Sequence, residues 1–88
     1  MPPHTKEDMH RHARARQFFF VLSGQATMKF EERQLVLSAT DGVEVEAGVW
    51  HQMFNESDSD VEFLVISSPK AHGDKEICGT HHENKPLN

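Results

Sequence analysis

The sequence of 88 residues has no tyrosine and a single cysteine, Cys78. A lone cysteine cannot form an intramolecular disulfide, so the chain needs no oxidising compartment and we expect a cytoplasmic protein. No apolar run approaches the roughly 18 residues of a membrane-spanning helix, and no basic start followed by an apolar stretch indicates a secretory signal. We therefore expect no membrane partner.

Positive charge is also scarce. The formal net charge is -5 at pH 7, and the one basic cluster consists of Arg11, Arg14 and Arg16. A cluster of this size does not reverse the overall charge, so we expect no nucleic-acid partner. Phosphate-binding loops, G-x-S-x-G motifs and paired cysteines are missing as well, so the chemistry that these motifs support is not indicated.

No stretch of ten residues has a convincing helical period with caps. Short segments that are rich in aromatic and β-branched residues, or that alternate between apolar and polar residues, instead predict strands. These segments cover residues 16–22, 26–31, 34–39, 43–47, 50–55 and 61–67. We expect the first two to form a hairpin around the turn residues Ser23, Gly24 and Gln25. Short strands at close spacing indicate an all-β, antiparallel sandwich or barrel.

The expected organisation is one β-barrel domain over residues 1–70 and a polar, loosely ordered C-terminal tail over residues 71–88. A chain this short buries roughly 60–65% of its unfolded surface, which leaves little surplus stability. A bound metal or a second subunit is therefore an expected additional stabiliser.

Histidine is abundant, with seven residues in the chain. His10 and His12 are separated by one residue, and on a strand such residues point to the same face. Two imidazoles aimed at one point are suitable ligands for zinc, copper, iron or nickel. Taken alone, the pair is better explained as a solvated strand end, because Arg11 and Arg14 lie beside it.

The pair belongs to a longer pattern. The sequence resembles the two motifs of the cupin superfamily, G-x5-H-x-H-x3,4-E-x6-G and G-x5-P-x-G-x2-H-x3-N. The residues that match the first motif or stand at its fixed positions are His4, His10, His12, Gln17 and Gly24, and those for the second are Gly48, His51 and Asn55. The similarity extends over about residues 3–69, and the joint spacing of the two motifs makes it specific.

The resemblance implies a small, single-domain antiparallel cupin β-barrel of the jelly-roll type. It also implies one divalent transition metal, either iron, manganese, nickel or zinc, inside one end of the barrel. The implied metal ligands are His10, His12, Gln17 and His51.

Function is implied less closely, because a fold does not determine a reaction. One expectation is a metal-binding cupin that acts on or binds a small oxygen-rich or anionic metabolite, with dioxygenase, isomerase and lyase activities among those of the family. The alternative is a non-catalytic, metal-assisted module that binds or senses a carbohydrate-like ligand. A third interpretation is a purely structural barrel without a metal, but the presence of all three motif histidines argues against it.

The sequence departs from the motifs at three positions. His4 stands at a glycine position. Glu46 stands where proline is usual, and Gly42 is too close to it for the five-residue gap. Gln17 replaces the carboxylate ligand, so that a set of neutral ligands would leave a divalent ion its full charge and bind it more weakly. Two roles are open for Gln17: it binds the metal directly, or it only donates or accepts a hydrogen bond with a water or a strand neighbour.

Strand parity orients the side chains around the expected site. The apolar residues that would line a pocket beside the metal are Phe19, Val21, Met53 and Phe63. Barrel core is the alternative role for all of them, and ordinary burial favours it. By the same rule Phe18, Phe20 and Leu22 face outward, and Trp50 points away from His51 as a packing or interface residue.

The first motif begins close to Met1, so we expect N-terminal strands of the barrel to be missing or supplied by a partner. Natural proteins cover an open sheet edge, which predicts a homodimer. In the tail, Cys78, His81 and His82 are best explained as chance ligands in a polar segment, and His72 has no visible partner.

Overall fold

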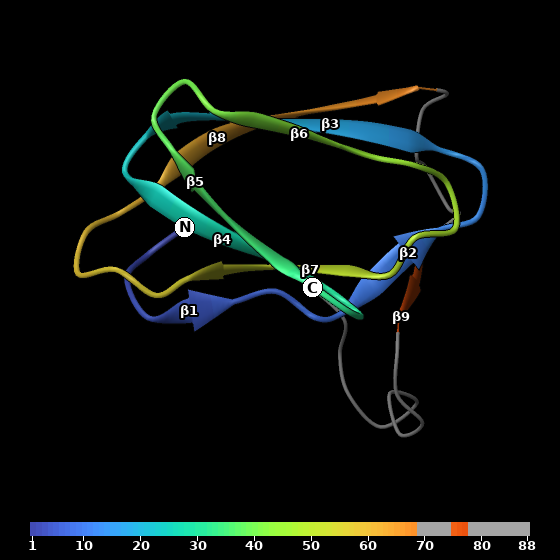
Figure 1. Ribbon diagram of the computed structural model, residues 1–88, viewed down its shortest axis with the longest axis horizontal. Helices are drawn as coiled ribbons and strands as arrows, with labels where there is room; N and C mark the ends of the chain where they lie inside the picture. The colour runs from blue at the N-terminus through green and yellow to red at the C-terminus, as the bar shows by residue number, and fades with distance from the viewer. Residues whose placement is uncertain (69–74, 78–88) are drawn as a thin grey trace.

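The computed structural model describes residues 1–68 and 75–77, and within them the only regular elements are β-strands. In chain order the strands are β1 (Thr5–Lys6), β2 (His10–His12), β3 (Arg16–Ser23), β4 (Gln25–Phe30), β5 (Gln34–Ser38), β6 (Gly42–Val45), β7 (His51–Asn55), β8 (Glu62–Ser68) and β9 (Lys75–Ile77). They form two antiparallel sheets that face each other (Figure 1). None of the described segments is a helix of the length and apolar character that a membrane span requires. The prediction of an all-β, antiparallel fold is confirmed.

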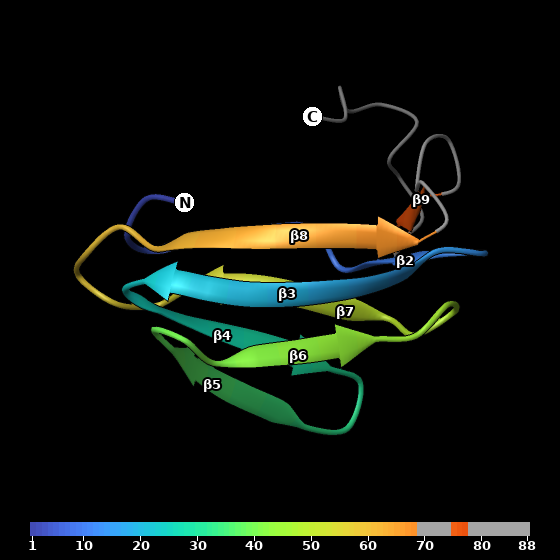
Figure 2. The same ribbon diagram turned by 90° about the horizontal axis from the view of Figure 1, so that it is seen from above.

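The larger sheet has the strand order β5-β4-β7-β2-β9, and β1 also pairs with β7. The smaller sheet has the order β6-β3-β8, so that β6 and β8 are its edges (Figure 2). Within the described ranges no hydrogen-bonded strand pair joins the two sheets, so the barrel is not closed by hydrogen bonds. The chain instead crosses between the sheets at several of its turns.

The predicted hairpin between residues 16–22 and 26–31 is wrong. β3 pairs with β6 and β8, whereas β4 pairs with β5 and β7 in the other sheet. Between them Gly24 has a φ of +84°, and a Cβ atom at this position would overlap the carbonyl oxygen of Asp60. The turn is therefore a tight corner between sheets. Turn residues predict a change of direction, but they do not determine whether the next strand stays in the same sheet.

Alternation along the strands separates the core from the surface. On β3, Phe19 and Val21 are buried while Phe18 and Leu22 are exposed, which confirms the predicted parity. Met28 and Met53 lie opposite each other on β4 and β7 and are both fully buried. The complete core cluster consists of Phe19, Val21, Ala26, Met28, Leu37, Val45, Met53 and Val61. The two inward faces thus form one apolar layer between the sheets.

A short strand, β9 (Lys75–Ile77), lies within the segment that we expected to be a polar tail. This strand pairs with β2 and places Glu76 opposite Arg11. Arg11 Nε donates a hydrogen bond to Glu76 Oε1 over 2.6 Å. The strand that carries His10 and His12 is therefore flanked by β7 on one side and by β9 on the other.

Candidate metal site

Three histidines converge at one end of the barrel. His10 and His12 lie on β2, His51 begins β7, and the register places His10 directly opposite His51. All three are buried, and a ligand nitrogen from each ring lies within 4.8 Å of the others. The ring centroids of His10 and His51 are 4.3 Å apart. The structure thus brings together the three motif histidines of the sequence.

Two of the rings are oriented by backbone carbonyls. Nδ1 of His10 lies 2.8 Å from the carbonyl oxygen of Asp8, and Nδ1 of His51 lies 2.8 Å from that of Val49. A carbonyl can only accept, so each Nδ1 donates, and in the neutral ring the lone pair is on Nε2. His51 Nε2 is buried and has no hydrogen-bond partner. Metal-binding histidines are commonly held in this way.

Burial also sets the charge of these rings. Desolvation, with a smaller contribution from the neighbouring rings of His10 and His12, lowers the pKa of His51 to about 4. Desolvation likewise lowers the pKa of His10 below its ordinary value of 6.5. Both imidazoles are therefore neutral at pH 7, which is the state in which they can bind a metal ion.

Gln17 lies on β3, in the sheet opposite the histidine-bearing strands β2 and β7. It is buried on the inward face of β3, two residues before Phe19, whose ring packs edge-on against His51 at a centroid distance of 5.7 Å. Gln17 Nε2 donates a hydrogen bond to Ser67 Oγ on β8 over 3.0 Å. Gln17 Oε1 is buried without a partner. Gln17 therefore makes the expected hydrogen bond to a strand neighbour through its nitrogen, and its oxygen stays available for the other expected role, metal ligation.

These donors fit a divalent transition metal. Imidazole nitrogens suit zinc, iron, nickel and copper, and an amide oxygen can complete such a set. Two nitrogens that bind one ion at about 2.1 Å each lie at most about 4.2 Å apart, so small ring rotations would bring the three onto one ion. A buried acceptor without a partner costs about 1–3 kcal/mol. His51 Nε2 and Gln17 Oε1 are two such acceptors.

A family model described as Cupin domain matches residues 1–67. The chain is a cupin. Both sequence motifs lie inside the matched region, as do the three clustered histidines. Among curated protein sequences, none matches this cupin significantly.

Solved structures share the cupin fold. An uncharacterized Klebsiella pneumoniae protein with a double-stranded β-helix domain gives a TM-score of 0.79, at 19% identity over 90% of this chain and 69% of that chain. The protein TT1209 from Thermus thermophilus gives 0.72, at 24% identity over 76% of this chain and 64% of that chain. A putative sugar phosphate isomerase from Acidithiobacillus ferrooxidans gives 0.70, at 25% identity over 76% and 44%. This cupin spans less than two thirds of the last two chains.

Backbone geometry explains the glycines of the cupin motifs. In residues 1–68 and 75–77, the φ angles in the left-handed region belong to His4 (57°), Gly24 (84°), Thr40 (74°) and Gly48 (82°). All four stand at positions that the motifs assign to glycine. Glycine is favoured there because a Cβ makes this conformation costly. The departures at His4 and Thr40 are therefore accommodated with backbone strain, and Gly42 is not the motif glycine.

The predicted pocket-lining residues lie in or against the core. Phe19, Val21 and Met53 belong to the buried cluster, and Phe63 packs against it. The core role that burial favours therefore applies to the first three, and their lining of a ligand site stays a prediction. Phe19 connects the core to the histidines through its contact with His51.

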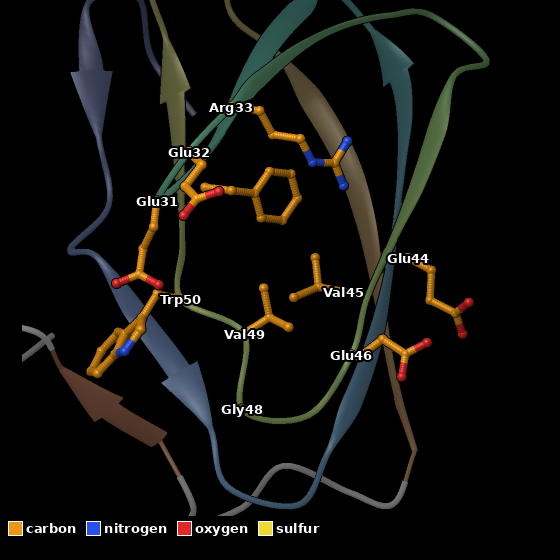
Figure 3. Close-up of a pocket in the computed structure, with 10 residues that line it drawn as sticks. Glu31, Glu32, Arg33, Glu44, Val45, Glu46, Gly48, Val49 and Trp50 are labelled. Carbon is orange, nitrogen blue, oxygen red and sulfur yellow. The ribbon is translucent and has the colours of Figure 1, made fainter.

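A pocket of about 400 Å³ opens near the same end of the barrel, between β4, β6 and the loop before β7 (Figure 3). Val45 and Val49 point into it and Arg33 reaches over it, whereas Glu46 points away. Val45 pairs with Gln17 across β6 and β3. The pocket thus adjoins the strand that carries the candidate amide ligand, although the histidines do not line it.

Asn55, the last residue of the second motif, has a structural role. It is fully buried, and its Nδ2 donates to the carbonyl oxygens of Met1 (3.0 Å) and Ser59 (2.7 Å). Its Oδ1 accepts from the backbone N of Ser57 (3.0 Å). The side chain therefore shapes the acidic loop after β7 and lies away from the metal chemistry.

Two residues of interest were not expected from the sequence. Ser67 is distant from Gln17 in the sequence and is brought to it by the pairing of β3 with β8. Burial raises the pKa of the Glu7 carboxyl, and Glu7 lines a separate pocket with Lys6, Asp8 and Lys75. His72, Cys78, His81 and His82 lie outside the described residues.

Proposed function

We propose that this cupin binds one divalent transition metal through His10, His12 and His51, with Gln17 as a fourth ligand. The observation that carries the proposal is the buried His51 Nε2, which has no hydrogen-bond partner and lies in a cluster of three imidazoles. The opposed Gln17 Oε1, equally buried and unpartnered, supports the fourth position. The metal is iron, manganese, nickel or zinc.

The proposed ligand of the metal is a small oxygen-rich or anionic metabolite. Four neutral donors leave the charge of the ion uncompensated, and a bound cation of this kind acts as a Lewis acid toward anionic or carbonyl oxygens. The Acidithiobacillus ferrooxidans structure is described as a putative sugar phosphate isomerase, and a sugar phosphate is an oxygen-rich anion.

A non-catalytic binding or sensing role is the second candidate. Among the residues that the structure describes, the clustered metal-ligand side chains are histidines alone, without a carboxylate that could act as a general base. The chain also has no tyrosine that could transfer a proton. Both observations favour binding without turnover over an isomerase, dioxygenase or lyase reaction. A cytoplasmic location is part of the proposal, since the lone cysteine fits a reducing compartment.

Metal-dependent ligand binding tests the function. Protein loaded separately with zinc, nickel, manganese or iron, and protein stripped with a chelator, should be heated with sugar phosphates, small dicarboxylates and neutral sugars. We expect oxygen-rich anions to raise the Tm by about 5 °C or more in the loaded protein only. An equal shift in stripped protein, or none in any loaded form, contradicts the proposal. Conversion of a stabilising ligand, followed by NMR, separates the enzyme from the binding module.

We further propose a homodimer in which β8 pairs with β8 of a second copy. β8 is an edge of the smaller sheet, and its Leu64, Val65 and Ile66 are 49%, 42% and 58% exposed. An antiparallel pair centred on Val65 would place Leu64 opposite Ile66 of the other copy and Glu62 opposite Ser68, so that no like charges meet. Such pairing covers an edge that natural proteins rarely leave open.

Light scattering after size-exclusion chromatography checks the dimer. We expect twice the 10.0 kDa of one chain, and we expect Ile66→Glu to shift the protein to the monomer because it buries two glutamates at the contact. Val36→Glu is the matched control, since Val36 is 55% exposed on β5 in the other sheet. A wild-type protein of 10.0 kDa, or equal effects of the two variants, contradicts this interface.

A further inference from the structure

We infer that Ser67 is a positioning residue that orients the amide of Gln17 so that its oxygen, and not its nitrogen, faces the metal ligands. The inference rests on the proposed metal site and concerns a residue outside the cupin motifs. It follows from one hydrogen bond, one unpartnered atom and the register of two strands.

The register fixes which residue can reach the amide. Gln17 on β3 pairs with Ser67 on β8, and both side chains turn to the inward face of the sheet. The hydrogen bond from Gln17 Nε2 to Ser67 Oγ measures 3.0 Å. The neighbouring Ser68 is exposed on the outer face, so within the pair Ser67-Ser68 only Ser67 can act on the amide.

The chemistry of an amide makes its orientation decisive. The amide nitrogen carries two hydrogens and no available lone pair, so only the oxygen can bind a cation. Turning the group by half a rotation would present two N–H donors to a divalent ion and to three imidazoles. In the structure Ser67 Oγ accepts from Nε2, and this hydrogen bond stabilises the orientation in which Oε1 is the unpartnered atom.

A carboxylate would need no such orientation. Its two oxygens are equivalent donors of electron pairs, and either end can bind a metal. A glutamate at position 17, the usual cupin residue, would therefore work without a serine at position 67. With glutamine in this chain, the hydrogen bond to Ser67 favours the orientation that a metal needs, which links a departure from the family pattern to a residue on another strand.

Metal affinity in four proteins tests this dependence. The proteins are the wild type, Ser67→Ala, Gln17→Glu and the double variant, and Co²⁺ or Zn²⁺ affinity is measured by competition with a chromophoric chelator. We expect Ser67→Ala to weaken metal binding about tenfold or more with glutamine at position 17, as loss of an outer-shell partner commonly does. With glutamate at position 17 we expect the same change to have an effect of less than about threefold.

A role in folding alone is separated by matched variants. Ser67→Thr keeps a hydroxyl and should restore affinity, whereas Ser67→Val has the same shape without the hydroxyl and should not. This pair also serves if Ser67→Ala folds poorly. Ser68→Ala makes the identical chemical change on the exposed neighbour and should leave affinity unchanged. The visible spectrum of the Co²⁺ protein should change in Ser67→Ala and Ser67→Val, because the set of donor atoms changes.

Each outcome is decisive. Equal affinities of wild type and Ser67→Ala, or equal losses with glutamine and with glutamate at position 17, overturn the role of Ser67 while the metal site stands. A wild-type protein that binds neither ion overturns the proposed function itself. Recovery by threonine without recovery by valine, seen only with glutamine at position 17, supports the inference.

Discussion

A variant with both His10 and His51 replaced by alanine is expected to be purified without metal. Wild-type protein expressed without added metal should contain about one transition-metal ion per chain by elemental analysis, and the double variant should contain none. The reason is geometric: His10 and His51 lie opposite each other on β2 and β7, and their removal leaves His12 as one buried imidazole. A single neutral imidazole does not retain a divalent ion through purification.

His4→Ala is the control for this experiment. His4 is also a motif-region histidine, but its side chain is 65% exposed and its Nε2 lies 2.8 Å from Asp58 Oδ1. Its removal should leave the metal content unchanged. Circular dichroism must verify that the double variant is folded, because the buried His51 also donates to a backbone carbonyl. If a folded double variant retains its metal, the ligands lie elsewhere in the chain.

Gly24→Ala is expected to cause the largest loss of stability of any single methyl addition in the described part of the chain. At this position the left-handed φ of +84° and a direct overlap with the backbone of Asp60 and Val61 act together. A backbone carbonyl cannot move aside as the end of a side chain can. We expect the free energy of unfolding to fall by about 4 kcal/mol, against roughly 5–10 kcal/mol for a chain of this size.

Gly48→Ala isolates the steric part of this effect. Gly48 has nearly the same φ, +82°, but nothing lies within 4 Å of a Cβ placed on it. Its substitution should therefore carry only the conformational cost, about 1–2 kcal/mol. Denaturant unfolding of the metal-free proteins measures both values. Equal losses for the two variants would mean that the corner between β3 and β4 opens to accept the methyl group.

Local patterns predicted β3 to β8 to within two residues, whereas β1, β2 and β9 were not among the predicted segments. Residues 16–22 were expected and β3 is Arg16–Ser23, because aromatic and β-branched residues leave little choice of conformation. The pairing of strands was not accessible in the same way, and the incorrect hairpin between β3 and β4 is the example. Alternation fixes the face of a residue but not the sheet to which its strand belongs.

The candidate site shows the same division. His10 and His12 could be placed together because residues two apart on a strand share a face, and the second motif added His51. Ser67 could not be found, since its contact with Gln17 joins residues 50 positions apart through the register of β3 and β8. The role of Asn55 was hidden for the same reason, because its partners include the backbone of Met1.

The long-range pairing of the larger sheet bears on how the proposed metal ion would be loaded. β7 pairs with β1, β2 and β4, so His51 meets His10 only after chain segments distant in sequence have come together. Such topologies fold slowly, in milliseconds to seconds. During that time His10 and His12, only two residues apart, would offer two ligands to an added metal ion, and an ion bound to the unfolded chain would stabilise the unfolded state. Folding before metal loading is therefore the productive order, and excess metal during refolding should retard it.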